Sequence, residues 1–169
     1  MKNILLPLLI VITTICSAQT KTTKELSDKY SSWTVFLYHN TLRMINQNDD
    51  KNFDEIIKDI EKVKIVSVNK KEKGFDDAQY TKLISSYKSE KFEEILTSRM
   101  EGRSVNAYIL EKNGETKGMV VTVNDTENIY VLDMVGKVAL NKIMNLLTYI
   151  QSNADINEKV REIARKQID

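Results

Sequence analysis

The strongest constraint on the fold is the dipeptide Asn113-Gly114, which separates two stretches rich in β-branched and aromatic residues. A type I′ turn needs positive φ at both of its central residues, and this dipeptide accepts that geometry readily. The sequence therefore predicts a β-hairpin between strands at residues 104–111 and 115–124. A third strand at 127–135 follows a short polar turn, so the three form an antiparallel meander.

Apolar side chains fall on both faces of this meander, unlike the alternation of a sheet that is wetted on one side. A two-residue loop at Asn113-Gly114 would place Tyr108 opposite Met119, and one at Asp125-Thr126 would place Met119 opposite Leu132. Helices can cover one face. The second face can be covered by the N-terminal segment, the C-terminal helix, another subunit or a ligand.

Helices and strands precede the meander. Residues 33–38 are aromatic and β-branched, which predicts a buried strand, and 63–68 predict a second one. Helical spacing of apolar residues predicts helices at 40–45 and 53–60, so these two strands are expected to be parallel through a crossover. Residues 76–100 have helical composition, with a break expected near Ser89.

Together these elements predict an α+β fold with helices packed on a mixed sheet of about five strands, in the order β-α-α-β-α-α-β-β-β-α. We expect a polar lead-in at 19–32, one α+β domain at 33–152 and a C-terminal amphipathic helix at 153–169. That last helix carries a narrow apolar stripe, so it is either a peripheral packed helix or a detachable interaction tail.

The first 18 residues predict a cleavable signal peptide. Lys2 is followed by an apolar stretch at 4–15 that is too short to span a bilayer. Cys16 and Ala18 are small residues at the two positions that a signal peptidase reads, so cleavage is expected between Ala18 and Gln19. We expect a periplasmic or secreted protein with no transmembrane segment after processing.

Cys16 opens an alternative, because a lipidated cysteine after an apolar stretch anchors bacterial lipoproteins. The bulky Ile15 before it does not fit that processing, so a lipid anchor at Cys16 is the less favoured reading. No other cysteine is present, so the processed chain has no disulfide. Lys2 is one of 25 basic residues, so the processed chain has as many basic as acidic residues and no electrostatic basis for binding nucleic acid.

The sequence contains no strong motif for catalysis, metal binding or nucleotide binding. His39 is the single histidine and is interpreted as a strand-end surface residue that could act as a pH-sensitive contact, rather than as a catalytic base. Asn48-Asp49-Asp50 and Asn124-Asp125 lack the EF-hand pattern and are interpreted as turns. The five glycines match no nucleotide-binding motif. We therefore assign no catalytic residue, metal ligand or cofactor.

Several segments occur in the order typical of a known family. They are Trp33 to Tyr38, Thr41 to Met44, Ile60 to Ile65, Phe92 to Leu96, Tyr108 to Gly114 and Val135 to Ile143. In this order the chain resembles the bacterial exported family named domain of unknown function 4252, from about Trp33 to Ile150. The resemblance implies an envelope protein, often a lipoprotein, with no assigned activity, and it transfers no site residue.

The favoured functional hypothesis is a non-enzymatic binding or interaction module that meets a protein partner or a second copy of itself. Its candidate surface combines one sheet face with the C-terminal stripe: Val105, Ala107, Ile109, Val120, Ile129, Val131, Ile156, Val160 and Ile163. A carboxylate-based hydrolase acting on envelope material is the alternative, and it predicts a pocket where acidic groups converge. A carrier of a small apolar ligand is a third possibility.

Overall fold

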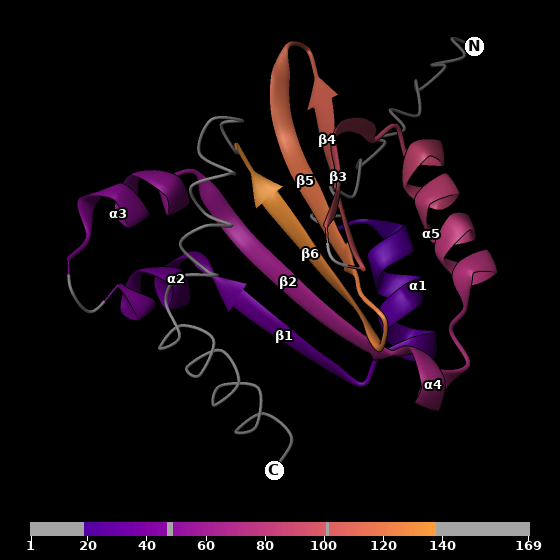
Figure 1. Ribbon diagram of the computed structural model, residues 1–169. Helices are drawn as coiled ribbons and strands as arrows, with labels where there is room; N and C mark the ends of the chain where they lie inside the picture. The colour runs from indigo at the N-terminus through magenta and orange to yellow at the C-terminus, as the bar shows by residue number, and fades with distance from the viewer. Residues whose placement is uncertain (1–18, 47–48, 101, 138–169) are drawn as a thin grey trace, which may run out of the picture.

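The computed structural model describes residues 19–46, 49–100 and 102–137, which form one sheet with helices against it (Figure 1). Residues 1–18, which include the predicted signal peptide, and all residues after Lys137, including Ile156, Val160 and Ile163, lie outside the described residues. The elements in chain order are α1 (Lys21–Tyr30), β1 (Trp33–Tyr38), α2 (His39–Ile45), α3 (Lys51–Ile57), β2 (Ile60–Asn69), α4 (Lys70–Lys73), α5 (Asp77–Ser89), β3 (Glu93–Met100), β4 (Arg103–Lys112), β5 (Glu115–Asn124) and β6 (Asn128–Gly136).

The α+β class is confirmed, with six strands in the order β1-β2-β6-β5-β4-β3. Every neighbouring pair in this sheet is antiparallel, so the predicted parallel pairing of the first two strands is wrong. The chain leaves β1 at Tyr38 and, after α2 and α3, re-enters the sheet beside it, where Tyr38 pairs with Lys62. The two helices are therefore an insertion in a hairpin and not a crossover.

The hairpin at Asn113-Gly114 is confirmed. Both residues have positive φ, 56° and 74°, and Lys112 pairs with Glu115 beside the turn. The predicted register is wrong, because a bulge after Leu110 shifts the pairing and sets Tyr108 opposite Val120. This one-residue slip reverses the faces expected for the side chains of β4.

The helix expected at 76–100 ends at Ser89, close to the predicted break, and its second half is strand β3. Lys91 adopts a left-handed conformation with φ of 70°, which ends the helical path. A bulge between Glu94 and Leu96 turns both Ile95 and Leu96 toward the same apolar cluster. Two adjacent apolar residues on one side imitate helical spacing, which explains the wrong prediction.

The expected polar lead-in at 19–32 is also corrected, because Lys21–Tyr30 form helix α1. The Thr20 side chain caps it by accepting a hydrogen bond from the Thr23 amide at 2.9 Å. Leu26 is the one large buried apolar side chain of α1, and it packs against the sheet. Figure 1 shows α1 and α5 side by side on one face of the sheet.

Carboxylates from distant parts of the chain hold the start of α1. Asp133 on β6 accepts hydrogen bonds from the Thr20 amide at 3.1 Å and the Thr20 hydroxyl at 2.9 Å. Glu90, after α5, accepts from the amides of Lys21 and Thr22 at 3.0 and 2.6 Å. We call Asp133 and Glu90 the N-terminal clamp. It binds amides that lack helical partners, so it compensates for the small apolar surface of α1.

Two apolar clusters lie on opposite faces of the sheet. The cluster beneath α1 and α5 contains Leu26, Val66, Val68, Phe75, Leu83, Tyr87, Phe92, Tyr108, Val120, Ile129 and Val131. The opposite cluster, to which α2 and α3 contribute, contains Val35, Leu37, Leu42, Phe53, Ile56, Ile57, Ile60, Val63, Ala107, Ile109, Met119, Val121 and Met134. The central strands are therefore buried on both sides, as the apolar character of both faces predicts.

Gly136 closes β6 at a position that only glycine fits. Its φ is 127°, and a Cβ atom there would lie 2.1 Å from the Asp59 carbonyl oxygen. We expect Gly136→Ala to lower the free energy of unfolding by about 3 to 5 kcal/mol, through steric overlap and backbone strain. Gly74→Ala is the control, because Gly74 has φ of 61° but open space around it, so its loss should be about 1 kcal/mol. Urea unfolding measures both variants, and equal losses of unfolding free energy in Gly136→Ala and Gly74→Ala would contradict this explanation.

Candidate functional site

Strand β1 forms one edge of the sheet, and no described residue pairs with its outer side. Its sequence, WTVFLY, contains no charged residue and no proline. Sheet edges that avoid pairing with other chains usually carry charges, prolines or bulges. Among the described strands, β1 therefore lacks the features that usually prevent pairing at an edge.

Two aromatic residues of β1 lie beside lysines of β2. Phe36 pairs across the strands with Lys64, and Tyr38 pairs with Lys62. The Lys62 Nζ atom lies 4.7 Å from the centre of the Phe36 ring and 5.2 Å from that of Tyr38, which are cation-π distances. The ammonium group of Lys62 thus contacts both rings near the sheet edge.

Large apolar side chains are exposed near this edge. Tyr38 is 55% exposed and Met44, in α2, is 75% exposed, and no other large apolar side chain of the described residues is classed as exposed. Phe36 is half-buried. We define the β1 edge surface as the outer side of β1 with Phe36 and Tyr38.

The opposite edge of the sheet has a different character. Strand β3 carries Glu93, Glu94 and Arg99, and the bulge after Glu94 interrupts its regular pairing. Both features oppose pairing with another strand. The two edges of the described sheet therefore differ, and only β3 carries the features that oppose pairing.

The residues predicted as an interaction surface do not share one face. Val105, Ala107 and Ile109 lie with the cluster toward α2 and α3, whereas Val120, Ile129 and Val131 lie beneath α1 and α5. The bulge in the hairpin causes this division. Five of the six are buried and Val105 is half-buried, so they stabilise the core of the chain. Sequence reasoning missed the β1 edge because strand order decides which strand is outermost.

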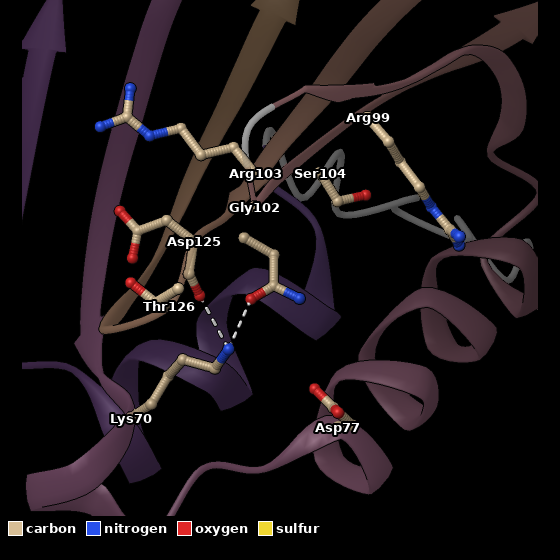
Figure 2. A pocket seen from close by; sticks show the side chains of 9 residues that line it. Lys70, Asp77, Arg99, Gly102, Arg103, Ser104, Asp125 and Thr126 are labelled. Atoms are coloured by element: carbon tan, nitrogen blue, oxygen red, sulfur yellow. Dashed lines mark hydrogen bonds between the residues drawn. The ribbon is translucent and has the colours of Figure 1, made fainter.

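An open hollow of about 500 Å³ lies where the β3–β4 and β5–β6 turns approach α4 and the start of α5 (Figure 2). Its charged lining residues are Lys70, Asp77, Arg99, Arg103 and Asp125. Lys70 Nζ donates to Asn124 Oδ1 at 2.9 Å and to the Asp125 carbonyl at 2.8 Å. Figure 2 shows Arg99 and Arg103 extending away from each other, so the two guanidinium groups do not form a clamp for an anion.

The turn residues interpreted from sequence have structural partners. The Asp125 carboxylate accepts from the amides of Glu127 and Asn128 at 2.8 and 2.6 Å, as in a turn. Asp50 caps α3 by accepting from the Asn52 amide at 2.8 Å. His39 begins α2, and its Nδ1 donates to the Ile60 carbonyl at 3.0 Å. Within 19–46, 49–100 and 102–137, no group of three or more His, Cys, Asp or Glu residues could hold a metal ion.

Asp133 is a titratable group buried under α1, away from the hollow. Burial raises its pKa above the ordinary aspartate value, although the Thr23 and Thr20 hydroxyls, the Thr20 amide and the charge of Lys64 lower it. Lys64 is its cross-strand neighbour, and burial lowers the pKa of that amine. The hydrolase alternative requires a carboxylate with a shifted pKa that faces an open pocket. Asp133 is the described carboxylate whose pKa burial raises, and it does not face one.

Comparison with known families decides the assignment. The model of the family described as domain of unknown function (DUF4252) matches residues 25–146. The chain belongs to this family. The DUF4252 match begins inside α1 and includes β6, so it covers all six strands. It confirms the resemblance found in the sequence.

No match was found among curated proteins or among solved structures. The DUF4252 description assigns no activity, so a function for the chain must be proposed from its own residues. None of the helices described for the chain is long and apolar enough to cross a membrane.

Lys70 should act as a structural link between α4 and the β5–β6 turn. We expect Lys70→Met to lower the free energy of unfolding by about 1 to 2 kcal/mol, because the half-buried carbonyl and amide oxygens lose a charged donor. The exposed neighbour provides the control, and Lys71→Met should change stability by less than about 0.5 kcal/mol. Both can be measured by urea unfolding, and similar values for the two would show that Lys70 has no such role.

Proposed function

We propose that the chain is an exported envelope protein without catalytic activity, which binds another polypeptide by strand addition at the β1 edge surface. The observation that carries this proposal is the asymmetry of the sheet: β1 is uncharged and exposes Tyr38, whereas β3 carries charges and a bulge. Strand addition gains affinity from backbone hydrogen bonds and specificity from alternate side chains.

The proposed occupant of this surface is a second copy of the chain, with the two β1 strands antiparallel. A two-fold axis at Phe36 would place Phe36 opposite its own copy and Thr34 opposite Tyr38 of the partner subunit. Aromatic cross-strand pairs of this kind stabilise a sheet by roughly 0.2 to 1 kcal/mol each. The same surface on both copies is what a closed two-fold dimer needs.

The dimer is tested with Tyr38→Lys. Tyr38 is more than half exposed, so the lysine should leave the fold intact while adding a charge at the pairing edge. Light scattering after size-exclusion chromatography should show a dimer for the unmodified protein and a monomer for Tyr38→Lys. The matched control is Glu93→Lys on the β3 edge, which should remain dimeric. A monomer at concentrations up to about 1 mM, the range of very weak complexes, would contradict the proposal.

Export is tested separately, on protein isolated from the cell envelope of its source. Mass spectrometry should find a chain that begins at Gln19, because the small residues at Cys16 and Ala18 suit signal peptidase. A chain that begins at a lipidated Cys16 would instead support the lipoprotein alternative. A chain that retains Met1 would refute cleavage of the signal peptide.

A further inference from the structure

Every backbone amide at the start of α1 has a hydrogen-bond partner. Asp133 accepts from the Thr20 amide, Glu90 accepts from those of Lys21 and Thr22, and the Thr20 hydroxyl accepts from Thr23. The Thr22 hydroxyl also donates to Glu90. Two carboxylates thus meet at the first turn of one helix, where the helix dipole favours negative charge.

The clamp is linked to the core by hydroxyl groups. The Thr20 and Thr23 hydroxyl oxygens lie 2.6 Å apart, and Thr23 shares a hydrogen bond of 2.8 Å with the Tyr87 hydroxyl. Thr23 and Tyr87 are both fully buried. A continuous chain of hydrogen bonds therefore connects α5, α1 and β6, and it fixes the position of Thr20.

The clamp carries two negative charges and lacks a close cation. Asp133 is 1% exposed, and no described lysine, arginine or histidine lies within ion-pair distance of Asp133 or Glu90. Lys64 is the cross-strand neighbour of Asp133, and burial weakens its charged form. A buried carboxylate is costly unless a positive charge or enough hydrogen bonds compensate it.

We propose that signal-peptide cleavage supplies this cation: the new α-amino group of Gln19 forms an ion pair with the N-terminal clamp of Asp133 and Glu90. This inference rests on the processing step of the proposed function. Adjacent backbone nitrogens lie within about 4 Å of each other. The Thr20 nitrogen is 3.1 Å from Asp133 Oδ2, so the amino group lies within roughly 7 Å of that oxygen.

The side chain of Gln19 already lies in this region. Its Oε1 atom accepts from Lys62 Nζ at 3.3 Å, whereas its Nε2 atom is buried without a hydrogen-bond partner. An unprocessed chain has a neutral amide at Gln19, and only the processed chain has a charge there. Cleavage between Ala18 and Gln19 therefore makes the mature chain more stable than any form with a neutral or extended start.

The pH dependence follows from the groups around the clamp. The charged and titratable groups near it are Lys64 of β2, Tyr87 of α5, and Asp28 of α1, which acts on Lys64. Lys62 of β2 also lies there, with its Nζ atom 3.3 Å from Gln19 Oε1, and its positive charge opposes the effect of the carboxylates. A carboxylate pair raises the folded-state pKa of an α-amino group, whose ordinary value is about 7.7 to 8.0. The added stability is thus present from about pH 7.5 down to the pH at which Asp133, whose pKa burial raises, becomes protonated, and it is lost as the pH rises through the folded-state pKa of the amino group.

The test compares two proteins that differ in this charge and in the Gln19 side-chain amide, which accepts a hydrogen bond from Lys62. A chain beginning at Gln19 is released from a fusion by a site-specific protease, and it retains every described element. Glutaminyl cyclase then converts part of it to pyroglutamate: the α-amino nitrogen bonds to the side-chain Cδ, ammonia leaves, and the positive charge is lost. At pH 6.5 the free amino form should have a Tm higher by about 2 to 6 °C, and the difference should become smaller above the amino pKa.

The control is the same pair in an Asp133→Asn, Glu90→Gln background, which keeps hydrogen-bond acceptors but removes both charges. The Tm difference between the free and cyclised forms should be smaller there, because only the effect of losing the Gln19 side-chain amide remains. Equal Tm values in the unmodified background, or an equal difference in both backgrounds, would overturn the inference. A matched chain extended by Ser17-Ala18 should behave like the cyclised form.

Failure of export can be distinguished from failure of the ion pair. The released chain begins at Gln19 whether or not cells process it, so the Tm comparison tests the clamp alone. Mass spectrometry of the envelope protein tests processing alone. An intact Met1 together with a clear Tm difference would refute processing in the cell, and it would still support the ion pair in a chain that begins at Gln19.

Discussion

The position of α1 depends on burying one carboxylate in the central strand of the sheet. Asp133 lies on β6, between β2 and β5, where both faces of the sheet are covered. Leaving that group without donors would cost several kcal/mol. Thr20 provides two donors, and Glu90 holds the next amides of the same helix. A helix with little apolar surface is thus fixed by polar contacts with parts of the chain that are distant in sequence.

The sheet has two edges with different physical properties. At β3, charged side chains and a bulge discourage pairing, and Lys88 lies 3.3 Å from Glu94. At β1, aromatic rings lie beside lysine ammonium groups and the strand carries no charge of its own. The positive charges that face this edge therefore come from β2 and contact the aromatic rings, while the backbone of β1 has no partner among the described strands on its outer side.

Local patterns in the sequence predicted local structure well. The Asn113-Gly114 turn, the apolar character of both sheet faces and the turn role of Asp125 all follow from nearest-neighbour chemistry, and the structure confirms them. The α+β class and the family were also predicted correctly.

The errors arose where distant residues decide the outcome. Bulges after Leu110 and Glu94 change faces by one residue and have no clear sequence signal. The helix at 21–30 is polar and depends on carboxylates at positions 90 and 133, so no window of neighbouring residues reveals it. The β1 edge was missed for a related reason, because an edge is a property of strand order.

The place of β6 between β2 and β5 also governs how the chain can fold. Strands β4, β5 and β6 pair with their neighbours in sequence, but β2 pairs with β6, which comes last among the described strands. The side of β2 that faces β6 therefore has no pairing strand while β3, β4 and β5 are being synthesised. Long-range pairing of this kind slows folding, and it leaves an aggregation-prone intermediate with an unpaired strand until β6 is inserted. A chain kept unfolded until all of it is available would avoid that risk.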